Sequence, residues 1–237
     1  MPRLLIINPN TSAQVTAMLR EHLQPMLGEA WRIDTVTARF GGVYIASEAA
    51  YAIAAHAVLD AWSTQPAGYD AILVGCFGDP GLEALREISG CPVVGLADAA
   101  MREAAQAGRF AIVTGGERWE PILRRLAASA GLLDHLCGLK VLTESGGELL
   151  ADPDQAMLKL EAAAREVQTE TAADAIVIGG AALAGMGESL ATRLPFAVID
   201  NVSAAARALQ ALAPAKGCGP DGTRYTGLSP ELMARLG

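Results

Sequence analysis

Two segments of the sequence follow one pattern, but only one of them carries a thiol. Residues 70–81 are DAILVGCFGDPG and residues 174–185 are DAIVIGGAALAG. Both start with Asp-Ala-Ile, continue through apolar residues and end in a glycine-rich turn, so that Cys76 corresponds to Gly180. A cysteine that follows a buried strand and starts a helix lies in the positive potential of the helix N-terminus. That potential lowers the thiol pKa and favours the thiolate.

Two interpretations of Cys76 are open. A free cysteine is often a small buried residue that fills the end of a strand. The place of Cys76 in a turn between Gly75 and Gly78 favours a reactive thiol instead. Such a thiol can act as an acid or as a base in proton transfer.

Further turns could complete a binding site around this thiol. In NPNTS, residues 8–12, Asn10, Thr11 or Ser12 could cap the next helix, and Asn10 could instead anchor a ligand. TGG at 114–116 and GGAA at 179–182 could present backbone N–H groups to a carboxylate or an enolate oxygen. GGVYIASE at 41–48 could form a lid that carries Tyr44. The predicted substrate-binding residues are Asn10, Tyr44, Gly75, Phe77, Gly78, Thr114, Gly115, Gly179 and Ala181.

The elements that position these turns follow from an alternation of short apolar runs with longer Ala-, Leu-, Glu- and Arg-rich segments. Continuous apolar runs are typical of buried parallel strands. We predict strands at residues 3–8, 32–38, 71–75, 92–96, 110–114, 139–144, 175–179 and 196–200. We predict helices at residues 11–26, 46–63, 80–89, 98–107, 117–130, 153–172, 184–193 and 201–212. This order predicts an α/β fold with right-handed crossovers.

The repeat divides the fold into two pseudo-symmetric Rossmann-like lobes with mainly parallel sheets. We assign residues 1–97 and about 201–215 to the first lobe and residues 98–200 to the second. Residues 216–237 are rich in glycine and proline and are predicted to form a C-terminal arm. Ligands of such folds bind beyond the carboxyl ends of the strands, so the active-site cleft is expected between the lobes.

Composition excludes several classes of function. The chain has 237 residues and a net charge of −8, without a basic cluster, which argues against partners such as nucleic acid or a membrane surface. No signal-peptide pattern is present at the N-terminus, so we expect a cytoplasmic protein with reduced cysteines. We expect no metal and no other cofactor, because the sequence has no metal-ligand spacing, no nucleotide-binding motif and no suitable pyridoxal-phosphate lysine.

The other cysteines are predicted to be structural. Cys91 precedes a strand away from the cleft, Cys137 lies in a predicted helix–strand connection, and Cys218 lies in the tail.

In these motifs the sequence resembles the aspartate/glutamate/hydantoin racemase superfamily, and most closely its hydantoin (allantoin) racemase branch. The resemblance spans about residues 3–205, in the order typical of the family. The segments that carry it are NPNTS, GCFGDPG, PVVGLADAA, VTGGERWEPIL, AIVIGGAALAGM and FAVIDNV.

The resemblance implies a cofactor-independent racemase that binds a small substrate between the lobes. In this family one cysteine removes the α-proton and a second delivers a proton to the opposite face. Cys76 matches the first of these, but Gly180 stands where the second is expected. Asp79, Thr114 and Glu117 are the polar residues of the cleft turns that could replace it.

Three functions follow from this departure. The leading hypothesis is a racemase or epimerase for a small hydantoin, amino acid or related α-substituted carboxylate. The second is a decarboxylase of the arylmalonate type with a single proton donor, although that branch keeps its thiol in the other lobe. Cys76 could also act as a nucleophile, as the resemblance to maleate isomerases implies. The third is a non-catalytic member that binds a small carboxylate. The resemblance also implies a homo-oligomer, and pocket walls are expected at Tyr44, Phe77, Trp119 and Met186.

Overall fold

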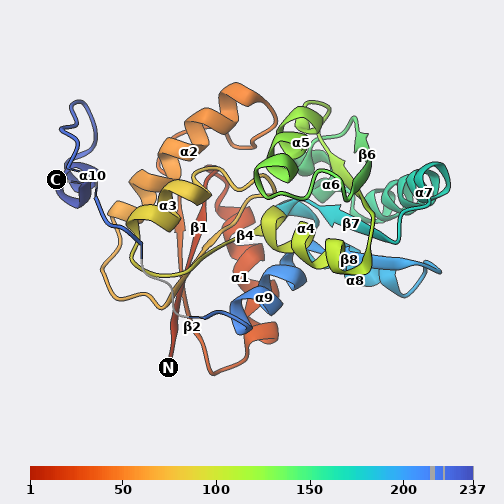
Figure 1. The fold of residues 1–237 in the computed structure, drawn as a ribbon, viewed down its shortest axis with the longest axis horizontal. Coiled ribbons are helices and arrows are strands. Elements are labelled where there is room, and N and C mark those ends of the chain that lie inside the picture. Colours follow the sequence, from red (N-terminus) through yellow and green to blue (C-terminus); the bar gives the residue numbers. More distant parts are fainter. Residues whose placement is uncertain (214–216, 221, 237) are drawn as a thin grey trace.

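Each half of the chain contributes one four-stranded parallel sheet to the computed structural model, which describes residues 1–213, 217–220 and 222–236. The strand orders are β2-β1-β3-β4 and β6-β5-β7-β8, so the second sheet repeats the first. In Figure 1, β1–β4 with α2 and α3 lie on the left, and β5–β8 with α5–α8 lie on the right. The predicted α/β fold with two similar parallel sheets is confirmed.

The first sheet and its helices occupy the N-terminal half of the chain. Their bounds are β1 Arg3–Asn8, α1 Ala13–Leu27, β2 Arg32–Thr37, α2 Glu48–Ser63, β3 Ala71–Val74, α3 Leu82–Ile88, β4 Val93–Gly95 and α4 Leu96–Ala107.

The second sheet follows in the same order. Its elements are β5 Phe110–Gly115, α5 Trp119–Ser129, β6 Leu136–Leu142, α6 Gly146–Ala151, α7 Pro153–Thr171, β7 Ala175–Gly179, the 3-10 helix η1 Ala181–Leu183, α8 Met186–Ala191 and β8 Ala197–Asp200. The chain then forms α9 Asn201–Gln210 and α10 Pro230–Leu236.

Burial on both faces explains why the strands are continuous apolar runs. Leu4 and Ile6 of β1 pack on one side of the sheet with α1, while Leu5 and Ile7 pack on the other side with α2 and α3. The cluster that contains Leu4 and Ile6 also contains Phe110 of β5, so apolar side chains of both sheets share one core. Helices α1, α4, α5 and α9 contribute to this shared core, which fixes the lobes against each other.

The division into lobes at about residues 97 and 201 stays a prediction. In its favour, all strands of the first sheet precede residue 97, all strands of the second lie between residues 98 and 200, and α9 contacts α1. Residues 214–216, 221 and 237 of the predicted first lobe and arm lie outside the described residues.

Helix starts differ from prediction where a serine caps the helix. The Oγ atoms of Ser12 and Ser47 accept hydrogen bonds from Val15 N (3.4 Å) and Ala50 N (3.2 Å), respectively. Because the capping residue has extended backbone dihedrals, α1 and α2 begin one residue after it, two residues later than predicted.

The largest boundary error concerns β6, which starts three residues before the predicted strand at 139–144. The prediction that Cys137 lies in a helix–strand connection is wrong, because Cys137 is within β6 and its Sγ donates to the carbonyl oxygen of Phe110 at 3.2 Å. Gly138 follows it, and a Cβ there would lie 2.8 Å from the Thr171 side chain of α7. Gly138 therefore allows α7 to pack closely on β6.

The predicted C-terminal arm contains a helix that the sequence analysis missed. Leu232 of α10 is buried against α2, and the Arg235 guanidinium lies 4.9 Å from the centre of the Trp62 ring. In Figure 1 this helix lies at the far end of the first lobe. No helix in the described part of the chain is long and apolar enough to cross a membrane.

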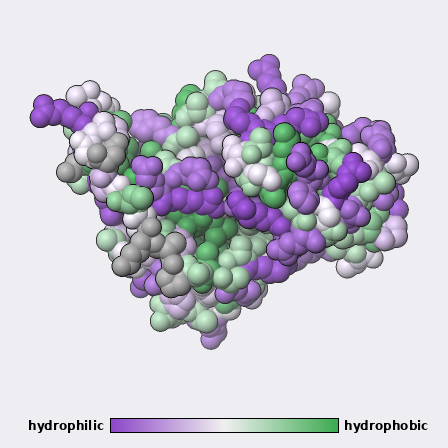
Figure 2. All heavy atoms as spheres, viewed as in Figure 1, coloured by the Kyte–Doolittle hydropathy of each residue, from purple (hydrophilic) through white to green (hydrophobic). Residues whose placement is uncertain are grey.

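One surface feature interrupts a largely polar exterior. On the face shown in Figure 2, hydrophilic residues predominate and hydrophobic residues gather in a central hollow. A groove beside edge strand β4 has apolar lining residues from β4, α4 and α9, among them Val94, Ala99, Ala204, Ala208 and Leu212.

Candidate active site

A cavity of about 60 Å³ lies where the two central strands of each sheet end. Its walls come from the turns after β1, β3, β5 and β7 and from the loop before α2. In both sheets the strand order reverses between these central strands, and such switch points are where α/β folds bind ligands. The lining residues are Asn10, Val15, Tyr44, Ile45, Ala46, Cys76, Phe77, Thr114, Gly115, Gly116, Trp119, Ser145, Gly146, Gly179, Gly180, Ala181, Ala182 and Leu183.

Cys76 lines this cavity and is 6% exposed. Its carbonyl oxygen accepts N–H bonds from Gly78 (3.0 Å) and Asp79 (3.1 Å), which fold the turn tightly after β3. Burial, and then the negative charge of Asp79, raise the pKa of the Cys76 thiol above its usual value.

The expected lowering of the thiol pKa by a helix N-terminus is therefore wrong. Helix α3 starts only at Leu82, with Gly81 as its N-cap, so Cys76 lies outside the first turn of the helix. The effect of a helix dipole falls off within that turn. Burial and the nearby Asp79 therefore favour the protonated form of the Cys76 thiol, because both raise its pKa.

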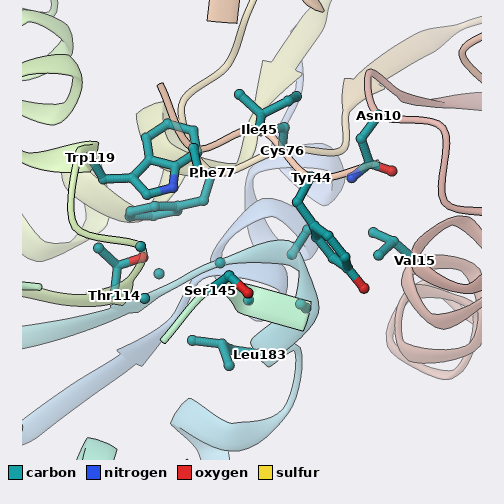
Figure 3. Close-up of a pocket in the computed structure, with 18 residues that line it drawn as sticks. Asn10, Val15, Tyr44, Ile45, Cys76, Phe77, Thr114, Trp119, Ser145 and Leu183 are labelled. Atoms are coloured by element: carbon teal, nitrogen blue, oxygen red, sulfur yellow. The ribbon is translucent and has the colours of Figure 1, made fainter. Parts of the chain in front are cut away.

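Aromatic rings of the cleft rest directly on glycines. A Cβ on Gly179 would lie 2.1 Å from the Phe77 ring, so the first-lobe ring occupies the space that a second-lobe side chain would need. A Cβ on Gly78 would lie 2.4 Å from the ring of Trp119, which makes the reverse contact. In Figure 3 the rings of Phe77 and Trp119 lie side by side at one end of the cavity.

Tyr44 makes a third contact of this kind. A Cβ on Gly147 of α6 would lie 2.5 Å from the Tyr44 ring and 2.8 Å from its hydroxyl oxygen. The loop at 41–47 thus crosses from the first lobe to the second, as expected of a lid. Glu48, the first residue of α2, continues this bridge through a two-bond ion pair with Arg125 of α5 (2.6 and 3.0 Å).

Asn10 offers a hydrogen-bond donor. Its Oδ1 accepts from Asn8 Nδ2 (2.8 Å) and from Ser12 N (2.9 Å), which uses the acceptor side of the amide. In Figure 3 the nitrogen of Asn10 points toward Cys76 and Tyr44. Ser12, and not Asn10, caps α1, whereas Asn10 organises the turn and directs its side-chain N–H groups to the cavity.

The glycine-rich turns of the second lobe also reach the cavity. Thr114, Gly115, Gly179 and Ala181 all line it. The N–H of Gly116 donates to the carbonyl oxygen of Leu142 (3.0 Å), so this N–H is already used. The predicted oxyanion site must therefore depend on the remaining donors.

Gly180 lines the cavity opposite the Cys76 turn, but its backbone is unfavourable for a cysteine. Its φ is +137°, a conformation that residues with a Cβ rarely adopt. A Cβ there would lie 3.2 Å from Leu183. The departure seen in the sequence is therefore matched by a backbone that suits glycine.

Sequence reasoning missed Ser145. Its Oγ lies 2.8 Å from Glu148 Oε2, and its backbone N–H donates to the same oxygen, in a capping box that starts α6. These hydrogen bonds keep the pKa of Glu148 below its usual value. The Ser-x-x-Glu spacing at 145–148 is the signal that could have identified this helix start.

The structure separates the predicted site residues into two groups. Nine line the cavity, namely Asn10, Tyr44, Cys76, Phe77, Thr114, Gly115, Gly179, Gly180 and Ala181. Others lie outside the lining: a Cβ on Gly75 would meet Leu19 of α1, and Gly78 supports Trp119. Trp119 is a wall as expected, whereas Asp79, Glu117 and Met186 are absent from the lining.

Among the residues that the structure describes, none that lines the cavity is Arg, Lys, His, Asp or Glu. Cys76 and Tyr44 are its titratable residues, and Thr114 and Ser145 add aliphatic hydroxyls. Within the described residues, no three His, Cys, Asp or Glu side chains come together as a set of metal ligands.

Comparison with known proteins shows which family and which solved structures this chain resembles. The family model described as Asp/Glu/Hydantoin racemase matches residues 4–209. The hydantoin racemase of Paenarthrobacter aurescens is 32% identical over 215 residues, which cover 89% of this chain and 90% of that protein. The allantoin racemase of Pseudomonas fluorescens superposes with a TM-score of 0.89 at 27% identity, over 95% of this chain and all of that one. Arylmalonate decarboxylase shares the fold, with a TM-score of 0.60 at 18% identity over 92% of this chain and 97% of that one.

Two facing α/β lobes with a thiol at their paired strand ends define the class of protein. The chain belongs to the Asp/Glu/hydantoin racemase family. It is accordingly an enzyme of the isomerase class, of the racemase type.

Proposed function

We propose that this enzyme racemises a small cyclic amide of the hydantoin class and that Cys76 transfers the proton at one face of the stereocentre. The observation that carries the proposal is the position of Cys76 in an uncharged cavity between the strand ends of both lobes. The similarity to hydantoin and allantoin racemases supports the substrate class.

The lack of charged side chains among the described lining residues favours a neutral substrate over the charged ones that the sequence left open. Aspartate, glutamate and malonates carry full carboxylate charges, whose desolvation needs a countercharge or several donors. The described residues that line the cavity supply no cationic side chain. A neutral hydantoin ring needs only hydrogen-bond donors for its carbonyl groups, and Asn10 Nδ2 is one such donor.

The chemistry requires one proton carrier at each face. When the α-carbon loses its proton, the C–H electron pair moves into the adjacent carbonyl group to give an enolate, which N–H donors stabilise. Cys76 delivers the new proton at its face and becomes a thiolate, or as a thiolate removes the α-proton of the other enantiomer.

For the opposite face we assign the hydroxyl of Ser145. It takes the α-proton onto Oγ as it passes its own proton to Glu148 Oε2, at 2.8 Å. Glu148 is exposed, so its carboxyl group exchanges this proton with water. Of the replacements suggested by the sequence, Thr114 lines the cavity and remains the second choice, whereas Asp79 and Glu117 do not line it.

The test is exchange of the α-proton in D₂O. Enantiopure 5-substituted hydantoins and allantoin are incubated with the enzyme, with aspartate, glutamate and aryl malonates in parallel, and followed by NMR and polarimetry. We expect deuterium incorporation with loss of optical rotation for the hydantoins, and at least a 1,000-fold decrease for Cys76→Ser. Cys91→Ser is the matched control, because Cys91 lies outside this cavity.

Ser145→Ala separates the two faces. We expect this variant to retain deuterium incorporation at the face of Cys76 but to lose racemisation. Equal loss of both reactions in Cys76→Ser and Cys91→Ser, or no exchange with any hydantoin, contradicts the proposal.

One observation favours a second candidate, a decarboxylase with a single proton donor. Cys76 is the one thiol among the described residues that line the cavity. The same incubations with aryl malonates would then release carbon dioxide. If no substrate turns over but hydantoins bind, the chain is the non-catalytic member that the sequence left open. A cytoplasmic location and a homo-oligomeric state stay predictions from the sequence.

A further inference from the structure

Asp79 combines several unusual features three residues after Cys76. It has a φ of +52° although it is not a glycine, and it is 2% exposed. Its own backbone N–H donates to the carbonyl oxygen of Cys76, so the carboxylate and the thiol belong to one tight turn. A strained, buried carboxylate in such a turn needs compensating contacts.

Those contacts come from the N-terminus of α4. Asp79 Oδ1 accepts from Ala97 N (3.1 Å) and Oδ2 accepts from Asp98 N (2.7 Å). The N-cap residue of α4, Gly95, cannot make this bond, since it has no side chain. A Cβ on Gly95 would lie 2.3 Å from the carboxyl carbon of Asp79, so the carboxylate fills the space that this glycine leaves.

Asp79 has few direct charge partners. Asp98 of α4 and Arg86 of α3 act on it with opposite signs, and these two form an ion pair with each other (2.8 Å). Burial is the largest cause that raises the pKa of Asp79, to about 7. Besides Asp79, the charged and titratable side chains that line the adjoining cavity of about 210 Å³ are Tyr51, Glu83, Asp98, Arg102 and Arg125.

We propose that Asp79 is a positioning residue for Cys76: it ties the turn at 76–79 to the N-terminus of α4 and places a negative charge beside the thiol. Cys76 then rests in its acid form and gives a proton before it accepts one. This inference rests on the proposed function only in that Cys76 transfers a proton.

The second lobe provides a matched comparison. Asp200 Oδ1 accepts from Val202 N (2.9 Å) and Ser203 N (3.1 Å) at the start of α9. Its Oδ2 accepts from Gly185 N (2.9 Å) and Gly187 N (3.1 Å) at the start of α8. Asp200 thus caps two helices, α8 and α9, with buried N–H bonds of the same kind as those of Asp79, but it has no part in the Cys76 turn.

The experiment measures the reactivity of the thiol without any substrate. Iodoacetamide alkylation of Cys76 is followed by mass spectrometry from pH 6 to 10, peptide by peptide because the other cysteines are also free. We expect Asp79→Asn to increase the alkylation rate at pH 8 about tenfold or more, since removal of a nearby charge favours the thiolate. Asp200→Asn should change it less than twofold, although it also loses cap bonds.

Two results overturn the proposal: an unchanged or slower rate in Asp79→Asn, or an equal rise in Asp200→Asn. Should Asp79→Asn fail to fold, the unmodified chain labelled with ¹³Cβ-cysteine replaces it. The Cys76 signal should then show an inflection as Asp79 titrates near pH 7, and its absence contradicts the proposal. Because no substrate is present, these outcomes are independent of whether hydantoins are racemised.

Discussion

Each lobe buries one carboxylate at the start of the helix that follows its last strand, but the two carboxylates come from different segments, with the parts exchanged. In the first lobe the turn itself supplies the carboxylate, Asp79, and α4 supplies the N–H groups. In the second lobe the carboxylate of Asp200 comes from the end of β8 and binds the N-termini of both α8 and α9. The exchange places a charge in the turn that holds the thiol and none in the turn that holds Gly180. Two lobes with the same fold can thus place a buried charge beside a cavity residue in one lobe and not in the other.

The largest expected effects come from the glycines beneath these carboxylates. Gly95→Ala places a Cβ 2.3 Å from the carboxyl carbon of Asp79, and Gly187→Ala places one 2.7 Å from Asp200 Cα. We expect each to lower the free energy of unfolding by about 3 kcal/mol in urea titrations. Only Gly95→Ala should also change the alkylation rate of Cys76. A similar change in Gly187→Ala would show that Asp79 has no special effect on the thiol.

The pH dependence of stability sharpens the comparison. In the folded protein the pKa of Asp79 is raised to about 7 from 3.8, so the folded state binds more protons between these values. Stability from this carboxyl group is complete below about pH 3.8 and is lost as the pH rises through about 7. Asp79→Asn should remove this pH dependence of the unfolding free energy, which amounts to on the order of 4 kcal/mol.

The matched variant for this pH curve is Asp200→Asn. The pKa of Asp200 is also raised by burial, but four N–H bonds oppose the shift. In urea titrations between pH 4 and 8, we expect Asp200→Asn to reduce the pH dependence of the unfolding free energy less than Asp79→Asn does. If Asp200→Asn reduced the pH dependence of the unfolding free energy more than Asp79→Asn, then Asp200 and not Asp79 would have the more strongly raised pKa.

Gly180→Cys adds the thiol that the second turn lacks. The φ of +137° and the 3.2 Å approach to Leu183 predict a loss of about 1–2 kcal/mol in unfolding free energy. Gly180→Ala should show the same loss, which isolates the backbone strain. Only Gly180→Cys should raise the rate of racemisation, measured by polarimetry with hydantoins. If Gly180→Ala also raised the rate of racemisation, the cause would be the changed shape of the turn and not a second thiol.

The smallest effect is expected at the ion pair between the lobes. Glu48 and Arg125 are 52% and 50% exposed, so Glu48→Gln should cost only about 0.5 kcal/mol. Glu120→Gln removes a similarly exposed pair, Arg124–Glu120, within one helix and should cost about as much. Only Glu48→Gln should alter the KM for hydantoins, because Glu48 adjoins the loop that carries Tyr44. Identical KM values for both variants would contradict a role of the loop at 41–47 in substrate binding.

Much of the fold was accessible from sequence because buried parallel strands are short apolar runs. β1 and β7 were predicted to the residue, since both are bounded by clear turn signals. β6 was misplaced because Gly138 resembles a turn but packs against α7. α10 escaped notice because its burial depends on α2, far away in the chain.

The candidate site was predictable where a turn follows a strand and less so elsewhere. Cys76, Thr114 and Gly179 occupy such positions and line the cavity. The direction of the Cys76 pKa shift was predicted wrongly, because it depends on where α3 starts and on the fold of Asp79 beside it. Ser145 was missed because local sequence does not show that α6 lies opposite the first lobe.

The apolar interior common to both sheets has a consequence for engineering. Phe110 and Leu4 belong to one cluster, so neither half can be replaced by the corresponding half of a distant relative without unmatched packing at the seam. Recombination between family members should therefore succeed when the exchanged segment is an exposed loop, and yield aggregated protein when it is an entire half.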